Sequence, residues 1–213
     1  MTSENAGNYQ LDTWRGDFGD SYTDRNVADE NALRARTKMW AQMLRSIEGE
    51  LPSSILEIGA NLGLNMRTLK RLTEAELFAL EPNAKARQIL LDEGVMEPQN
   101  LFDAYASAIP MEDRSVDMAF TSGVLIHVPP NDLLASCTEM HRVSRKYIVC
   151  AEYFSVAPQE LKYRGHNGLL FKRDFGDFWM SSFPDLKLRD YGFFWKRATG
   201  LDNLTWWVFE KGE

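Results

Sequence analysis

The sequence has few cysteines and few histidines. Its 213 residues include two cysteines and three histidines. Cys137 and Cys150 each lie in an apolar stretch, as is typical of buried, reduced thiols in a reducing compartment, so we expect no disulfide. The histidines do not sit with the cysteines at a metal-ligand spacing, so we expect no metal site.

Long hydrophobic runs and an excess of basic residues are also lacking. No apolar run approaches the roughly 20 residues that a membrane-spanning helix needs, and no basic segment followed by an apolar one stands at the N-terminus. The formal charge is −7, which argues against a partner held through a phosphate backbone. We therefore expect a cytoplasmic protein that acts on a small molecule and binds neither nucleic acid nor membrane.

The composition that remains is that of a globular protein, with 44% apolar and 12% aromatic residues. A chain of this length can bury one full core but not two well-packed ones, so we expect a single domain over 1–213. Apolar runs that suit strands alternate with helical patterns. The expected strands are 54–58, 76–81, 100–104, 116–121 and 146–152, and the expected helices between them are 63–72, 83–93 and 131–142.

This alternation predicts an α/β fold with a Rossmann-like, mostly parallel sheet and helices on both faces. Two further apolar runs, 186–194 and 204–210, predict a C-terminal antiparallel hairpin that completes a seven-stranded sheet. Helical spacing over 27–48 predicts a leading helix. The aromatic-rich segment 1–26 is expected to form a lid, or alternatively a helix packed on the sheet.

A glycine-containing turn and a distant carboxylate are the most informative features. The apolar run 54–58 leads into Gly59, Asn61 and Gly63, and Glu81 closes the next apolar run, 22 residues after Gly59. Glycines let a backbone approach a ligand at a strand-to-helix turn, and a carboxylate at the second strand tip accepts hydrogen bonds from ribose hydroxyls. The pairing predicts a nucleoside-cofactor pocket, the alternative being an ordinary turn with loop glycines.

Glu57, just before this turn, distinguishes between cofactors. A dinucleotide site would place glycines around a pyrophosphate, which a nearby carboxylate would repel. Glu57 can instead hold an ammonium, so the predicted cofactor is S-adenosylmethionine (SAM), which carries an ammonium, a sulfonium and an adenosine. The turn resembles motif I of the class I SAM-dependent methyltransferases, with Asn61 in place of the middle glycine. Asparagine tolerates a left-handed backbone better than most residues.

The other strand tips are candidate sites because ligands of open parallel sheets bind at the carboxyl ends of the strands. The class I resemblance places Ala106 and Ser107 beside the adenine, the alternative being a generic polar turn before a strand. In the lid, Arg25 is expected to pair with the SAM carboxylate, while aromatic rings shield the sulfonium through cation–π contact. The expected cofactor-binding residues are Trp14, Tyr22, Arg25, Glu57, Gly59, Asn61, Gly63, Glu81, Pro82, Ala106, Ser107, Ser122 and Gly123.

Two residues after the later strands are candidate catalytic groups. His127 follows the fourth expected strand, and an imidazole with its ordinary pKa near 6.5 can accept a proton at neutral pH. The alternative for His127 is to cap the helix 131–142. Glu152 terminates an apolar strand, where it is either a site residue or a salt-bridge partner.

The segment 153–175 is expected to be a substrate-binding loop insertion. It contains Tyr153, Tyr163, Arg164 and His166, and a guanidinium can grip a carboxylate or phosphate of an acceptor through two hydrogen bonds. A solvated basic loop is the alternative.

Several motifs together resemble the pseudaminic acid biosynthesis-associated methylases, over nearly the whole chain. They are the segments 14–20, 57–65, 123–127, 163–166 and 172–175. The resemblance implies a small, sugar-derived acceptor such as a nonulosonic acid. Open alternatives are a methyltransferase of another small-molecule or natural-product pathway and a SAM-binding regulatory protein without transfer activity.

Overall fold

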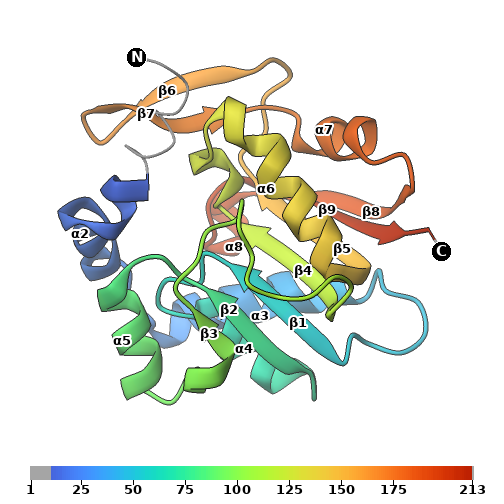
Figure 1. Cartoon of the computed structure of the whole chain (residues 1–213), viewed down its shortest axis with the longest axis horizontal. Coiled ribbons are helices and arrows are strands. Elements are labelled where there is room, and N and C mark those ends of the chain that lie inside the picture. The colour runs from blue at the N-terminus through green and yellow to red at the C-terminus, as the bar shows by residue number, and fades with distance from the viewer. Residues whose placement is uncertain (1–10, 213) are drawn as a thin grey trace.

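The computed structural model describes residues 11–212 and has a seven-stranded sheet in the order β3-β2-β1-β4-β5-β9-β8 (Figure 1). Strands β1 to β5 are parallel, and β9 runs antiparallel to both of its neighbours. This confirms the predicted α/β fold with an antiparallel C-terminal pair. The strands are β1 Ser54–Ile58, β2 Glu76–Leu80, β3 Leu101–Phe102, β4 Val116–Ser122, β5 Ser144–Glu152, β8 Leu186–Phe194 and β9 Leu204–Lys211.

Helices connect the strands and cover both faces of the sheet. They are α2 Asp17–Arg25, α3 Glu30–Leu44, α4 Leu64–Leu72, α5 Ala84–Asp92, α6 Pro130–Val143, α7 Phe175–Ser182 and α8 Lys196–Thr199, with 3-10 turns η1 Pro98–Asn100 and η2 Leu125–His127. Side chains that accept an amide hydrogen bond mark three helix starts: Asp29 for α3, Asn83 for α5 and Asp174 for α7. Such caps satisfy amides that have no partner within the helix.

Alternate residues of the buried strands feed two separate cores. On the α3 and α4 side, Trp40 packs edge-on against Phe120, with 4.5 Å between ring centroids. On the α6 and α7 side, Trp179 lies near Phe209. Both faces of the sheet are therefore buried, so the carboxyl edge of the parallel strands is left as the natural place for a ligand.

The segment 153–175 is not the loop that the sequence predicts. It contains a two-stranded hairpin, β6 Gln159–Tyr163 and β7 His166–Lys172, which forms a sheet of its own. The two connecting residues, Arg164 and Gly165, both have positive φ, 49° and 89°. Positive φ at both positions is the geometry of the tight turns that join antiparallel strands.

The N-terminal and leading segments differ in extent from the expectation. The leading helix, expected over 27–48, is α3 Glu30–Leu44, and the preceding segment folds as α2. Residues 1–10 of the expected lid lie outside the described residues. In Figure 1, α2 lies at the same end of the molecule as the β6–β7 hairpin, and Phe18 of α2 contacts His166 of the hairpin, with ring centroids 5.3 Å apart.

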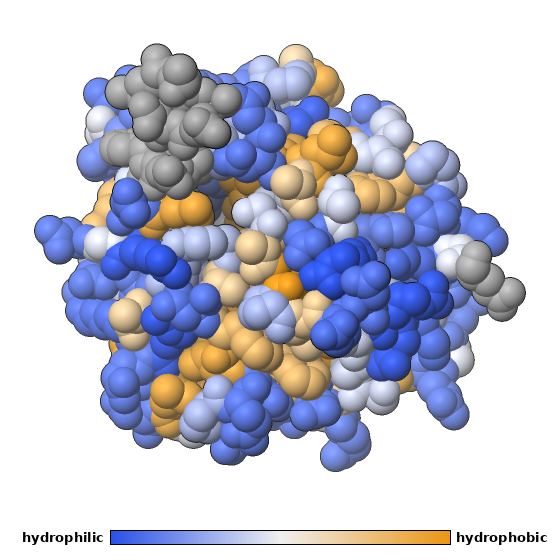
Figure 2. Space-filling view, in the orientation of Figure 1, coloured by the Kyte–Doolittle hydropathy of each residue, from blue (hydrophilic) through white to orange (hydrophobic). Residues whose placement is uncertain are grey.

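The surface is mixed in polarity. On the face in Figure 2, hydrophobic residues gather near the middle of the view and hydrophilic residues surround them. Within residues 11–212, no helix has the length and apolarity that crossing a bilayer requires.

Candidate functional site

A cavity of about 210 Å³ lies at the carboxyl ends of β1, β2 and β4, beneath the N-terminal segment. Its walls bring together residues that are far apart in the chain, from Leu11 to Ser136. All of the predicted cofactor-binding residues except Arg25 and Gly63 line it: Trp14, Tyr22, Glu57, Gly59, Asn61, Glu81, Pro82, Ala106, Ser107, Ser122 and Gly123.

The glycine turn after β1 shapes the floor of this cavity. Gly59 has a φ of 74°, and a Cβ there would lie 2.7 Å from Cγ2 of Val124. Gly63 has a φ of 67°, and a Cβ there would meet Leu90 and Val95. Gly59 thus allows the turn to approach the segment after β4, while Gly63 serves packing behind the cavity wall.

Glu57 enters the cavity as a buried carboxylate with one free oxygen. Its Oε1 accepts a 2.6 Å hydrogen bond from Nδ2 of Asn65, whose Oδ1 accepts one from the Trp40 indole at 3.1 Å. Its Oε2 is buried and has no hydrogen-bond partner among the described residues. Burial raises the pKa of Glu57 to about 8. A buried acceptor without a partner is costly, so this oxygen is suited to a cationic ligand.

Arg36 of α3 is a cavity residue that the sequence analysis misses. It lines the cavity, and its Nε is buried without a hydrogen-bond partner among the described residues. Burial lowers its pKa, and the Glu57 carboxylate opposes that shift. The signal available in the sequence is position: Arg36 lies on the same helical stripe as the buried Met39, Trp40 and Met43, where a charged residue is unusual.

Arg25 does not occupy the predicted position. It is exposed at the end of α2, and its guanidinium lies 5.7 Å from the centroid of the Tyr22 ring. It does not line the cavity. The prediction that Arg25 pairs with a cofactor carboxylate is therefore wrong, because the last turn of α2 exposes this side chain to solvent.

Glu81 lies at the tip of β2 and is held by two backbone amides. Its Oε2 accepts from the Asn61 amide at 2.7 Å, and its Oε1 accepts from the Asn83 amide at 2.8 Å. Burial raises its pKa, while these amide bonds oppose the shift. Each carboxylate oxygen can accept a second hydrogen bond, which two neighbouring hydroxyls would supply.

The segment after β3 contributes Ala106 and Ser107 to the cavity lining, to which α6 contributes Asp132. Arg142 fixes this segment by donating to the carbonyls of Ile109 and Met111 at 3.0 and 2.8 Å. The wall is therefore preorganised by backbone contacts.

His127, in η2, also lines the cavity. Its Nδ1–H donates to the carbonyl of Leu169 in β7 at 2.5 Å, and its ring packs between Trp14 and Tyr163, with centroid distances of 4.8 and 5.2 Å. Burial lowers its pKa to about 4. The imidazole is thus neutral at physiological pH, with the lone pair of Nε2 available, and does not titrate near 6.5 as the sequence analysis assumes.

Glu152 is placed differently from the expectation of a proton-accepting base. It is buried and absent from the cavity lining. Its carboxylate accepts from three consecutive amides, those of Val124, Leu125 and Ile126, at 3.1, 3.1 and 3.3 Å. This corrects its expected role: Glu152 has no contact with the cavity and instead holds the turn that carries His127.

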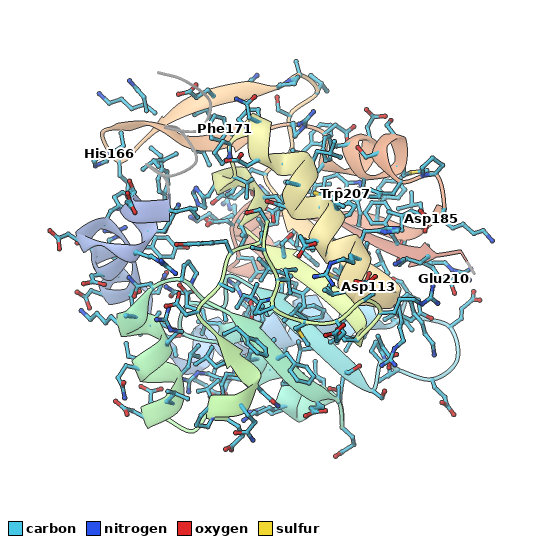
Figure 3. All side chains as sticks on the ribbon, in the orientation of Figure 1. Asp113, His166, Phe171, Asp185, Trp207 and Glu210 are labelled. Atoms are coloured by element: carbon cyan, nitrogen blue, oxygen red, sulfur yellow. The ribbon has the colours of Figure 1, made fainter. Side chains whose placement is uncertain are left out.

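The four predicted substrate-binding residues are not brought to one place. Tyr163 packs on His127, and His166 lies at the hairpin end that approaches α2 (Figure 3). Arg164 is exposed at the hairpin turn. Tyr153 lines a separate, more open groove, where its hydroxyl donates to Asp202 at 2.8 Å. Only Tyr163 and His166 therefore pack against the aromatic roof formed by Trp14, Phe18 and Tyr22.

The described residues do not contain a candidate metal site. Over residues 11–212, no group of three or more histidine, cysteine, aspartate or glutamate side chains is placed to hold a metal ion.

Known proteins provide an independent comparison. Residues 56–149, which run from β1 into β5, match the family model described as a methyltransferase domain. These residues are thus similar to a SAM-dependent methyltransferase domain, and the strand order is that of the class I methyltransferase fold. SAM is the cofactor of such domains, and the glycine turn and the β2 tip that line the cavity lie within the matched residues.

Solved structures of low identity share the fold of the methyltransferase domain. The 1,6-didemethyltoxoflavin-N1-methyltransferase of Burkholderia thailandensis, with bound S-adenosylhomocysteine, is 16% identical, with a TM-score of 0.72 over 97% of this chain and 91% of that one. The magnesium protoporphyrin IX methyltransferase of Synechocystis PCC 6803, with bound SAM, is 9% identical, with a TM-score of 0.69 over the whole of both chains.

One curated relative matches in sequence. Dimethylglycine N-methyltransferase of Parasynechococcus marenigrum is 22% identical over 131 residues, which cover 59% of this chain and 46% of that enzyme. The match thus spans about half the length of that relative.

Proposed function

We propose that this protein transfers the methyl group of SAM to a small polar acceptor. The observation that carries the proposal is the pair of ionisable side chains in the cavity, Glu57 and Arg36, whose Oε2 and Nε have no hydrogen-bond partner among the described residues. An amino-acid tail carries one ammonium and one carboxylate, and this pair is complementary to both. Glu57 binds the ammonium and Arg36 the carboxylate.

The remainder of the cavity fits the adenosine part of SAM. Glu81 accepts from the ribose hydroxyls through its remaining lone pairs. Gly59 lets the backbone approach the ligand, and Ala106 and Ser107 form a narrow wall for a flat base. When bound, SAM supplies a methyl group activated by a neighbouring sulfonium.

The protein then positions the acceptor and excludes water. Trp14 and Tyr22 cover the cavity, and removal of water strengthens electrostatic interactions inside it. Correct positioning alone contributes on the order of 7–11 kcal/mol to lowering the barrier of a two-reactant step. His127 orients the acceptor by accepting a hydrogen bond at Nε2, and it takes the proton of a hydroxyl or amine only as that group becomes acidic during transfer.

The acceptor class rests on the family resemblance. The motifs shared with the pseudaminic acid biosynthesis-associated methylases support a nonulosonic acid or another sugar-derived metabolite. A methyltransferase of a different small-molecule pathway is the alternative, and the similarity to dimethylglycine N-methyltransferase supports small amines as a second acceptor class. The exposed position of Arg164 weakens the argument that this arginine grips an acidic acceptor.

Calorimetry with SAM and S-adenosylhomocysteine tests the cofactor assignment. The wild-type protein should bind both, and Glu81→Ala should weaken binding by about 1.5–3 kcal/mol, the usual contribution of hydrogen bonds to a charged group. Absence of binding by the wild-type protein at millimolar ligand would overturn the proposal.

Label transfer separates an enzyme from a regulatory protein. Methyl-labelled SAM is incubated with the protein and pools of nonulosonic acids, amino sugars and small amines, and transfer to a small molecule is followed. Binding without turnover in every pool would favour a SAM-binding regulatory protein without transfer activity.

A further inference from the structure

We infer that Asn61 and Asn83 form a latch that holds the N-terminal segment 11–26 closed over the cofactor cavity. In this inference both asparagines are positioning residues, since they act through the segment and through Glu81. It rests on the proposed function, because it assigns the cavity to SAM.

The side chain of Asn61 bridges the glycine turn to α2. Its Nδ2 donates to Oγ1 of Thr23 at 3.1 Å, and its Oδ1 accepts from Nδ2 of Asn26 at 3.0 Å. Thr23 is 2% exposed, so this contact lies inside the interface between the segment and the domain. Both polar ends of the Asn61 amide are thereby bonded to α2 and its C-cap residue.

Asn83 makes the second connection, at the start of α5. Its Nδ2 donates to Oδ1 of Asp20 at 2.8 Å and to the carbonyl of Trp14 at 3.2 Å, while its Oδ1 caps α5. The approach is close, since a Cβ on Gly19 would lie 2.8 Å from this Nδ2. The segment is therefore fixed at two points, which lie on either side of the cavity-lining Tyr22 in the sequence.

Glu81 links the two connections. The backbone amides that hold its carboxylate belong to Asn61 and Asn83, the same residues whose side chains hold the segment. A ligand that bonds to Glu81 therefore stabilises the backbone positions from which the latch extends. Closure of the segment and occupancy of the ribose position are coupled through these shared residues.

The latch explains why this turn has Asn61 where the class I pattern has its middle glycine. Asn61 has a φ of 45°, a region that glycine adopts more readily than asparagine. A glycine would keep the backbone bond to Glu81 and lose only the two side-chain bonds to α2. The side chain thus has a use that offsets its conformational cost.

Asn61→Gly isolates the latch, because it restores the favoured residue for that backbone conformation. Stopped-flow release of S-adenosylhomocysteine should be about tenfold faster, the effect expected from losing two neutral hydrogen bonds. Amide hydrogen exchange of residues 17–26 should accelerate in the complex, while exchange in β1 and β4 stays unchanged. A release rate and an exchange pattern equal to those of the wild type would overturn the inference.

Thr23→Val provides a second variant that leaves the glycine turn untouched. It should also speed ligand release, and the double variant should release ligand no more than about twofold faster than Asn61→Gly, because both changes remove one shared contact. Fully additive effects would contradict the latch. The exposed Asn31, replaced by alanine, is the control and should keep the wild-type rate.

The experiments distinguish a failure of the latch from a failure of the proposed function. If wild-type protein binds neither SAM nor S-adenosylhomocysteine, the cofactor assignment fails. If the wild type binds and Asn61→Gly releases ligand at the same rate, only the latch fails.

Discussion

At the residue scale, the cavity is defined by ionisable groups that are incompletely paired. Among residues 11–212, one buried oxygen of Glu57 and one buried nitrogen of Arg36 have no hydrogen-bond partner. Such groups reduce the stability of the ligand-free fold and become favourable only when a complementary ligand is bound. We interpret them as groups whose burial cost in the ligand-free protein is relieved when the ligand binds, which favours binding.

Replacement of Glu57 by glutamine should remove a pH dependence of stability. Burial raises the folded-state pKa of Glu57 from 4.5 to about 8, so the folded protein retains a proton that the unfolded chain releases. The stabilisation is full below pH 4.5 and is lost as the pH rises through 8. Urea unfolding should show that the free energy of unfolding falls more between pH 5 and pH 8 for the wild type than for Glu57→Gln. The exposed Glu112→Gln is the control and should behave as the wild type. An equal fall for the wild type and Glu57→Gln would contradict this prediction.

Sequence reasoning identifies residues well where one strand tip determines their position. Glu57, Gly59 and Glu81 all follow from the β1–turn–β2 pattern and all line the cavity. It fails for Arg36, because the helical stripe shows only that this side chain faces the protein interior, while the docking of α3 decides that it reaches the cavity. For Asn61, the pattern indicates only that the backbone tolerates asparagine, while the use of its side chain depends on α2.

At the element scale, the short turn η2 is held in place by hydrogen bonds to two strands, β5 and β7. Glu152 at the end of β5 accepts from the amides of Val124, Leu125 and Ile126, and the carbonyl of Leu169 in β7 fixes the ring of His127. The turn has little structure of its own and takes its shape from these two strands. The strand-end pattern places Glu152 correctly but does not show that it faces backbone amides and not the cavity.

Glu152→Gln should therefore destabilise the fold by about 1–3 kcal/mol, since a glutamine amide accepts at only one of its two polar ends and leaves at least one of the three backbone amides without its acceptor. Urea unfolding measures the loss, and hydrogen exchange should accelerate at the amides of 124–126. A variant of wild-type stability that has lost only methyl transfer would instead indicate a direct catalytic role.

The β6–β7 hairpin is the element that the sequence predicts least well. Its strands pair mostly with each other and not with the main sheet, so no long apolar run marks them. Leu169 and Leu170 are nevertheless buried, which anchors β7 and brings the Leu169 carbonyl to His127. The hairpin turn carries Arg164 to the surface, away from the cavity.

At the scale of the whole molecule, the cavity joins parts of the chain that would otherwise be loosely connected. The N-terminal segment, the glycine turn, the segment after β3 and α6 all contribute to one lining. A ligand bound there contacts elements from both sides of the sheet. It should therefore stabilise the fold as one unit.

S-Adenosylhomocysteine should raise the melting temperature of the protein. At a ligand concentration of about 100 times Kd, linkage gives about 2.7 kcal/mol, which corresponds to roughly 5–10 °C for a chain of this size. Differential scanning fluorimetry measures the shift. NAD serves as the comparison ligand and should produce none, because Glu57 disfavours a pyrophosphate; an equal shift with NAD would contradict the cofactor assignment.

The sheet has one further consequence, for the order in which the protein matures. Strand β9 follows β8 in the chain but lies between β5 and β8 in the sheet. While the ribosome is still making residues 186–203, β8 has no strand to join, and the edge of β5 stays open. The nascent chain therefore exposes an unpaired apolar edge until residues 204–211 emerge, which makes this interval the one most open to misassembly and to chaperone binding.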